Sequence, residues 1–196
     1  MQQKKLLGTK ENGGNEFQMS FSIASNILTD TKEFIGVRDS IFNEVLSSFD
    51  NDPVSIFQVG AIETFKDDWR YGSGWSDIIF GKYIKKNGGK LVIVDIDMDH
   101  LSHSFFAACK MGYKVNVIFD DAKNIINQDK YDIYYLDGSN DPVETLEQFN
   151  IAMSVNDKAV FIVDDYSIKG TLLPDGFKMY DVANKVGVLD LRGKIT

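Results

Sequence analysis

Carboxylates recur in this chain at the points where apolar runs end. Acids stand at or after four such runs: Asp95, Asp120 and Asp121, Asp137, and Asp164 and Asp165. The carboxyl ends of parallel strands meet at one edge of a sheet, where nucleotide-binding α/β proteins place the acid that holds a ribose. Taken singly, each acid is explained equally well as a residue that caps a turn or a helix. Their joint placement after successive strands favours a binding site.

A glycine-containing stretch precedes the first of these acids. The apolar run 54–59 breaks at Gly60, and a polar loop then leads to Gly72, Gly74 and Ser76 just before a helical pattern. This arrangement presents the free N–H groups of a helix start to an anionic ligand. The stretch therefore predicts one wall of the same binding site.

Spacing of apolar residues predicts alternating strands and helices. The predicted strands are 54–59, 91–96, 115–119, 132–136 and 159–163, and the predicted helices are 33–49, 76–86, about 101–111 and 141–153. Continuous Val- and Ile-rich strands need both faces covered, so these five should be parallel and central. Two further runs, 177–182 and 186–191, are joined by three residues and should pair as an antiparallel hairpin. Residues 1–32 read as a polar N-terminal arm or lid, and residues 33–196 as one domain.

Bulk composition limits the classes of partner. The chain has 196 residues, of which 43% are hydrophobic, and this is enough for one soluble domain. A net charge of −8 without clustered Lys and Arg argues against nucleic acid and favours a small or neutral substrate. One cysteine, no signal-length apolar segment and no membrane-length run favour a cytoplasmic protein without a membrane partner. The sequence leaves the oligomeric state open.

The series VDID, DDA, YLDG and VDD, in that order after successive strands, resembles the class I S-adenosylmethionine-dependent methyltransferases. The similarity covers about residues 54–191 and is closer to the small-molecule O-methyltransferase branch that includes catechol and macrocin O-methyltransferases. This resemblance implies an α/β, Rossmann-like class I methyltransferase sheet, mostly parallel, with seven strands and a C-terminal antiparallel hairpin. It also implies an enzyme that uses S-adenosylmethionine to methylate an oxygen of a small-molecule or sugar-like acceptor.

The same resemblance assigns a cofactor site. Gly60 would let the backbone pass close to the methionine half of S-adenosylmethionine, and Asp95 would bind the ribose hydroxyls. The Gly74–Ser76 segment would hold the cofactor carboxylate, and Asp121 the adenine amino group. The cofactor-binding residues that it implies are Gly60, Ala61, Gly74, Trp75, Ser76, Asp95, Ile96, Asp121, Ala122 and Asp137, with Ile96 and Ala122 flanking the base.

A metal site is implied beside it. Asp137, Asp164 and Asp165 stand where metal-dependent O-methyltransferases bind Mg2+, which would lower the pKa of the acceptor hydroxyl. The family's lysine base corresponds to Asn140, so Lys169, Asp165 and Tyr166 are candidate substitutes. The predicted catalytic residues are Asp137, Asp165 and Lys169. The alternative is that these aspartates cap turns or helices without a metal.

Several features depart from the family pattern. Gln58 replaces the acid that usually opens the first motif, and Glu63 is a candidate replacement for the lost carboxylate. About eleven residues are inserted before the Gly-Trp-Ser segment, and the insert's Trp69 and Tyr71 would either cover the ligands or pack on the domain. Two other classes therefore stay open. One is a degenerate, non-catalytic binding protein, and the other is a nicotinamide-dependent oxidoreductase, against which the missing G-x-G-x-x-G pattern counts.

Overall fold

Seven strands form one mixed sheet in the part of the chain that the computed structural model describes, residues 38–65, 75–181 and 185–195. The strands are β1 (Val54–Val59), β2 (Gly89–Asp95), β3 (Asn116–Phe119), β4 (Ile133–Leu136), β5 (Val160–Val163), β6 (Lys178–Tyr180) and β7 (Val186–Asp190). Their order is β3-β2-β1-β4-β5-β7-β6, and the first five run parallel. β7 lies antiparallel between β5 and β6. The chain therefore changes direction across the sheet between β1 and β4, which is where open α/β sheets bind ligands.

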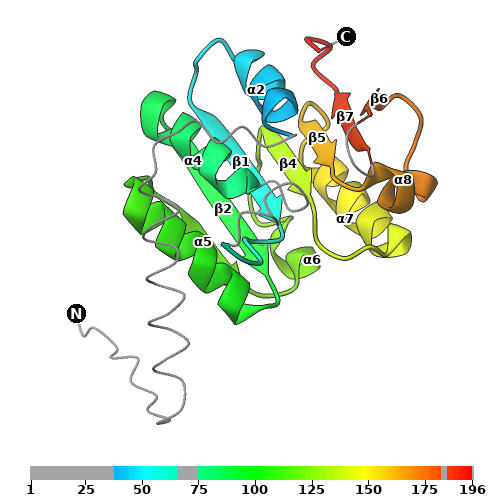
Figure 1. Ribbon diagram of the computed structural model, residues 1–196. Coiled ribbons are helices and arrows are strands. Elements are labelled where there is room, and N and C mark those ends of the chain that lie inside the picture. Colours follow the sequence, from blue (N-terminus) through cyan, green and yellow to red (C-terminus); the bar gives the residue numbers. More distant parts are fainter. Residues whose placement is uncertain (1–37, 66–74, 182–184, 196) are drawn as a thin grey trace.

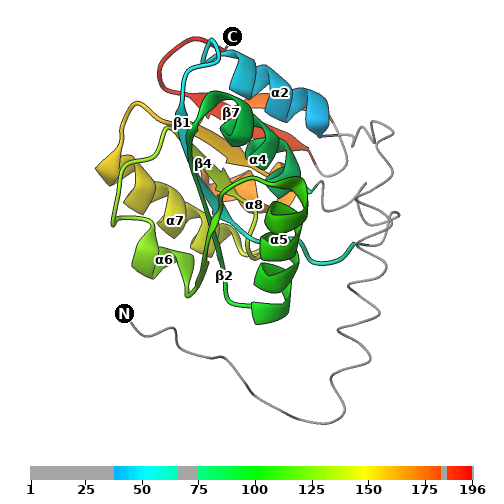
Figure 2. The same ribbon diagram turned by 90° about the vertical axis from the view of Figure 1, so that its left-hand side faces the viewer.

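Helices cover both faces of this sheet (Figures 1 and 2). The helices are α2 (Asp39–Ser47), α4 (Ser76–Asn87), α5 (Met98–Met111), α6 (Ala122–Ile125), α7 (Pro142–Val155), α8 (Tyr166–Lys169) and the 3-10 turn η2 (Gly170–Leu172). α2, α4 and α5 lie on one face, and α6 and α7 lie on the other (Figure 2). None of the helices in the described ranges is long and apolar enough to cross a membrane.

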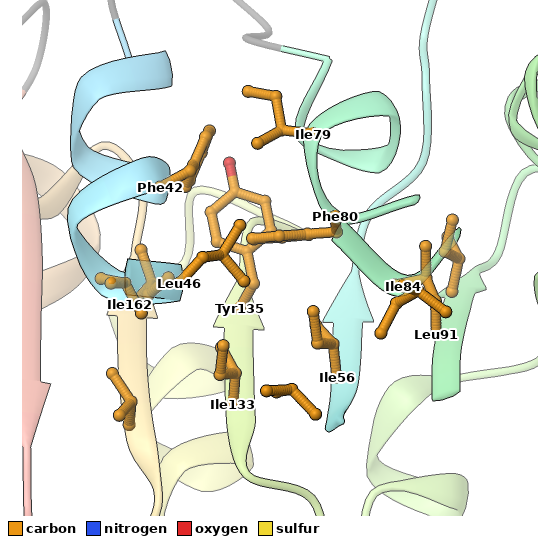
Figure 3. Packing of buried hydrophobic residues seen from close by; sticks show 14 of the residues in the cluster. Phe42, Leu46, Ile56, Ile79, Phe80, Ile84, Leu91, Ile133, Tyr135 and Ile162 are labelled. Atoms are coloured by element: carbon orange, nitrogen blue, oxygen red, sulfur yellow. The ribbon is translucent and has the colours of Figure 1, made fainter. Parts of the chain in front are cut away.

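The strands are apolar throughout because each of their faces meets a layer of helices. On β4, Ile133 and Tyr135 pack in the cluster beneath α2 and α4, whereas Tyr134 and Leu136 pack toward α7. Figure 3 shows the first of these clusters, in which the rings of Phe42 and Tyr135 meet edge to face. These two layers fix the strand ends, and with them the side chains that follow each strand.

Four of the helix starts differ in how the chain enters the helix. Asp97 and Asp141 cap α5 and α7 in the ordinary way, since each side chain accepts backbone N–H groups of the first turn. By contrast, Trp75 and Asp165, which precede α4 and α8, both have left-handed backbone conformations and make no side-chain cap. Such conformations cost about 1–3 kcal/mol for a residue other than glycine, and they tend to occur at binding sites.

The predicted fold is confirmed, including the parallel central strands and the antiparallel pairing at the C-terminal end. Some details differ. The first helix ends at Ser47 rather than at residue 49, while its predicted start at 33 lies outside the described residues, and α6 was not predicted. The few residues between Asp165 and the C-terminal hairpin predict a short or absent helix after β5, and the structure has only the short α8 and η2 there. The predicted arm at 1–32 and the aromatic residues Trp69 and Tyr71 lie outside the described residues.

Candidate functional site

A cleft of about 690 Å³ opens at the carboxyl edge of the central strands. Its walls come mainly from the residues that follow the five parallel strands β1 to β5 and from the first turn of α4. Ten acidic side chains line it: Glu63, Asp77, Asp95, Asp97, Asp120, Asp121, Asp137, Glu144, Asp164 and Asp165. Among the described lining residues only Arg38 and Lys169 carry a permanent positive charge. The potential in the cleft therefore favours a cationic ligand over an anionic one.

Gly60 turns the chain at the floor of the cleft. Its φ is +90°, and a Cβ atom there would stand 2.3 Å from the carbonyl oxygen of Asp137. Only glycine fits both the backbone angle and this close approach between the β1 and β4 ends. The next residue, Ala61, donates its N–H to Asp95 Oδ2 at 2.9 Å. The predicted loop and the predicted acid are thus brought into direct contact.

Asp95 is held on two sides by backbone groups. Besides Ala61, the N–H of Asp97 donates to Asp95 Oδ1 at 2.8 Å, and His100 Nδ1 lies 3.5 Å from Oδ2. A carboxylate oxygen has two lone pairs, so Asp95 retains acceptor capacity on the cleft side. Beside it, Ile96 is 75% exposed and offers an apolar surface to a ligand ring.

Asp121 acts as a helix cap in this structure. Its Oδ1 accepts the N–H of Lys123 at 2.9 Å and so begins α6. Asp120 in turn accepts the N–H of Asp121. Asp121 and the buried Ala122 both line the cleft. The capping alternative is therefore realised, while adenine recognition by Asp121 stays a prediction.

A buried amide and carboxylate pair forms the back wall, and its acid was not among the predicted residues. Gln58 and Asp77 are only 2% and 1% exposed. Gln58 Nε2 donates to the carbonyl of Gly60 at 2.8 Å and to Asp77 Oδ1. Asp77, and not the exposed Glu63, is therefore the carboxylate that contacts Gln58. Sequence reasoning passed over it because an acid in the first turn of a helix is ordinary.

This pair has unsatisfied hydrogen-bonding capacity. Within the described residues, Gln58 Oε1 and Asp77 Oδ2 are buried and have no hydrogen-bond partner. Burial raises the pKa of Asp77 to about 6, although the neighbouring Ser104 and Gln58 oppose the rise. Leaving a buried acceptor without a donor costs about 1–3 kcal/mol, so two of them indicate a place for a ligand that brings N–H donors.

The other end of the cleft contains the three predicted metal ligands. Tyr135 Oη lies 2.9 Å from Asp137 Oδ2 and 3.0 Å from Asp164 Oδ2. Burial and both carboxylates raise the pKa of Tyr135 well above its usual value, so it stays a donor. Its single hydrogen serves one carboxylate at a time. Burial and the neighbouring Asp137 also raise the pKa of Asp164 to about 7, so Asp164 can carry the proton for the other contact.

Two cations are embedded among these acids. Lys169 Nζ lies 2.8 Å from Asp137 Oδ1. Arg38 Nε lies 2.8 Å from Asp164 Oδ1, and its Nη2 lies 3.5 Å from Asp165 Oδ1. We define Arg38, Lys169 and the three aspartates as the acceptor-end cluster. The predicted catalytic residues Asp137, Asp165 and Lys169 are therefore close to one another.

The acceptor-end cluster does not fit Mg2+. A hard divalent cation takes six or more oxygen ligands, and here Lys169, Arg38 and Tyr135 already contact the carboxylate oxygens. Across the described ranges, no three His, Cys, Asp or Glu side chains are grouped so that they could hold a metal ion.

The remaining predicted residues have mixed placements. The Trp75 indole is buried, packs on Phe65 and donates to the carbonyl of Thr64 at 3.0 Å. It therefore anchors the loop. Trp75 and its neighbour Ser76 both line the cleft, and contact of either with a ligand stays a prediction. Gly74 lies outside the described residues.

Comparison with known proteins gives a similarity of fold. No protein-family model and no curated protein matches the chain in sequence. An rRNA methylase from Streptococcus thermophilus is 14% identical with a TM-score of 0.53, and the match covers 82% of this chain and 98% of that one. TrmN from Thermus thermophilus is also 14% identical with a TM-score of 0.55, over 87% of this chain. This chain spans only 52% of TrmN.

A third solved structure, a hypothetical protein that also comes from Thermus thermophilus, is 11% identical with a TM-score of 0.56, over 82% of this chain and 90% of that one. Identities this low carry the fold alone. Together with the strand order, they confirm the class I methyltransferase fold. None of the three is named as an O-methyltransferase, so that branch stays a prediction.

Proposed function

We propose that this chain, which has the class I methyltransferase fold, is an S-adenosylmethionine-dependent methyltransferase. The observation that carries the proposal is the pair of buried acceptors, Gln58 Oε1 and Asp77 Oδ2, on the wall of an acidic cleft. A ligand that satisfies them must bring hydrogen-bond donors, and a positively charged donor such as the ammonium group of a methionine derivative suits a carboxylate best. The carboxylate missing from β1 at Gln58 is thus supplied from α4.

The rest of the cleft fits the same cofactor. Bound S-adenosylmethionine would supply an activated methyl group on its positively charged sulfur. Asp95 has acceptor capacity for ribose hydroxyls, and the exposed Ile96 offers a face for the base. Gly60 keeps the loop backbone close to the floor, so the ligand can lie across the β1 and β4 ends.

A nicotinamide dinucleotide fits less well. Its pyrophosphate carries negative charge, and the cleft is lined by ten acidic side chains against Arg38 and Lys169. Both of these cations already contact carboxylates. The antiparallel β7 also departs from the doubly wound sheet of dinucleotide-binding folds.

We assign the acceptor to the end of the cleft at Asp137 and Lys169, and we infer that it is an oxygen of a small-molecule or sugar-like compound. The Lys169 ammonium would hold the acceptor oxygen beside the transferred methyl group. Transfer would break the bond between the methyl group and the cofactor sulfur and would release the proton of the acceptor oxygen. Asp137, whose Oδ1 lies 2.8 Å from Lys169 Nζ, would be the carboxylate beside the acceptor that takes up this proton. Asp165, at the start of α8, is a second carboxylate at this end.

RNA methylation is the second candidate. The structural similarity to an rRNA methylase over 98% of that chain favours it. Binding an RNA backbone draws on Lys and Arg, however, and both the net charge of −8 and the acidic cleft oppose it. The small acceptor therefore remains the better supported class.

Binding of S-adenosylhomocysteine to the full chain tests the proposal by calorimetry. We expect wild type to bind, and Asp77→Asn to bind roughly 10- to 100-fold more weakly, because a charged hydrogen bond is worth about 1.5–3 kcal/mol. Asp132→Asn is the matched control, since Asp132 bonds Ser55 outside the cleft. A wild type that does not bind, or equal binding by Asp77→Asn, would contradict the proposal. Release of S-adenosylhomocysteine with hydroxylated acceptors then separates an enzyme from a non-catalytic binder.

A further inference from the structure

The acceptor-end cluster holds two fixed positive charges where the family resemblance implied a metal ion. We propose that Arg38 and Lys169 together take the place of a divalent cation, so that methyl transfer at this site needs no metal. The inference rests on the proposed function for the role of this end of the cleft. Its first test, which measures metal binding, is independent of that function.

Arg38 is fixed in place as a permanent cation. It directly precedes α2, is 2% exposed, and lies 2.8 Å from Asp164 and 3.5 Å from Asp165. A guanidinium is not deprotonated in proteins, so Arg38 keeps its positive charge beside Asp164 and Asp165. The charge that Arg38 brings to Asp164 and Asp165 is therefore as constant as that of a bound ion.

Lys169 is equally enclosed but keeps hydrogen-bonding capacity. It is 1% exposed, it lines the cleft, and its Nζ lies 2.8 Å from Asp137 Oδ1. An ammonium group has three N–H donors, and among the described residues Asp137 is its one hydrogen-bond partner. A remaining donor can bind the acceptor oxygen, which is the contact that a metal ion would otherwise make.

The charges of the cluster explain why a metal would be excluded. Asp137, Asp164 and Asp165 bring three negative charges when all are ionised, and Arg38 with Lys169 brings two positive ones, the same as one Mg2+ ion. A divalent cation added to the cluster would face both fixed cations within a few ångströms and would have to displace their hydrogen bonds. The carboxylates are thus already neutralised as far as a metal would neutralise them.

Metal binding can be measured without an acceptor. The unfolding temperature of the full chain is recorded in EDTA and in millimolar MgCl2, MnCl2 or CaCl2, and the ions are also titrated calorimetrically. We expect no rise in the unfolding temperature and no saturable heat for wild type. A saturable stabilisation of wild type by any of the three ions would overturn the proposal, because a ligand that binds only the folded state must raise its stability.

Variants of Lys169 test whether its positive charge is what prevents metal binding. Lys169→Met leaves three carboxylates facing one cation, so we expect Mn2+ or Ca2+ to raise the unfolding temperature of this variant. Lys169→Arg keeps the charge and should gain no such response, and Lys90→Met, which removes a surface partner of Asp129, is the control. If Lys169→Met folds and gains no metal response, the assigned role of Lys169 is wrong. If it does not fold, the wild-type titration and the EDTA comparison below decide.

The outcomes for the two proposals are separable. S-adenosylhomocysteine binding that is unchanged by EDTA, with no metal binding, supports both. If wild type binds a metal, or if EDTA abolishes methyl transfer, the proposal that Arg38 and Lys169 replace a metal is wrong, while the proposed methyltransferase function stands. If neither S-adenosylhomocysteine nor a metal binds, the proposed function is wrong, while the inference that the cluster excludes metals still holds.

Discussion

Replacing Asp77 by asparagine should stabilise the free protein and weaken its ligand binding at the same time. Asp77 is 1% exposed, and burial raises the pKa of its carboxyl to about 6. A carboxyl whose pKa is higher in the folded than in the unfolded state opposes folding whenever it is ionised. The cost is absent below the ordinary value of 3.8, grows as the pH rises, and is complete above about pH 6.

The magnitude follows from the same values. The difference between 3.8 and about 6, at about 1.4 kcal/mol per pH unit, corresponds to about 3 kcal/mol of lost stability above pH 6. Asparagine carries no charge and keeps an oxygen for the Gln58 Nε2 bond. We therefore expect Asp77→Asn to be more stable than wild type by up to about 3 kcal/mol at pH 7.5 and by almost nothing near pH 4.

Urea unfolding of both proteins between pH 4 and pH 8 measures this difference, since changes at other groups cancel. Asp97→Asn is the control with the opposite sign, because the backbone N–H groups of His100 and Asp99 lower the pKa of Asp97. Its removal should cost stability at pH 7.5 and less at low pH. A variant at Asp77 that is less stable than wild type, or a stability gain that is equal at all pH values, would refute the assignment of a strained buried carboxylate.

Two further predictions concern the floor and the acceptor end of the cleft. Gly60→Ala places a Cβ atom 2.3 Å from the carbonyl oxygen of Asp137 at a φ of +90°. It should lower the free energy of unfolding, measured in urea, by about 1–3 kcal/mol or more, and it should abolish the binding of S-adenosylhomocysteine measured by calorimetry. Unchanged stability and binding would contradict the close approach. Asp137→Asn leaves the buried Lys169 without its carboxylate, so it should lower the free energy of unfolding in urea by about 3–5 kcal/mol at neutral pH. Asp129→Asn, which breaks the surface pair with Lys90, is the control. An equal effect of both variants would show that the pair of Asp137 and Lys169 is not buried in solution.

Much of the fold could be read from the sequence because its signals are local. The apolar runs ending at Val59, Asp95 and Val163 needed both faces covered, and they form parallel strands as predicted. Asp141 and Pro142 marked the start of α7 because a cap and a first-turn proline act within one turn. α6 escaped because four residues are too few to show a periodicity.

The site was less readable, since its partners come from distant segments. That aspartates gather at the strand ends followed from parallel pairing, and Asp95 and Asp137 do lie on one cleft. The positive charges beside these aspartates could not be predicted in the same way. Arg38 lies 126 positions before Asp164, and it comes close to Asp164 because α2, which follows Arg38, packs in one apolar cluster with the strands. The same holds for Asp77, whose partner Gln58 lies on another element.

The ring of Tyr166, in α8, packs against two glycines, Gly170 just after α8 and Gly187 in β7. A Cβ atom at Gly170 would stand 2.6 Å from this ring, and one at Gly187 in β7 would stand 2.2 Å from it. The three positions therefore share one volume, although they lie 4 and 21 residues apart along the chain. A larger residue at either glycine would therefore require the Tyr166 ring to move, whereas a small residue at position 166 would make room for a side chain at both.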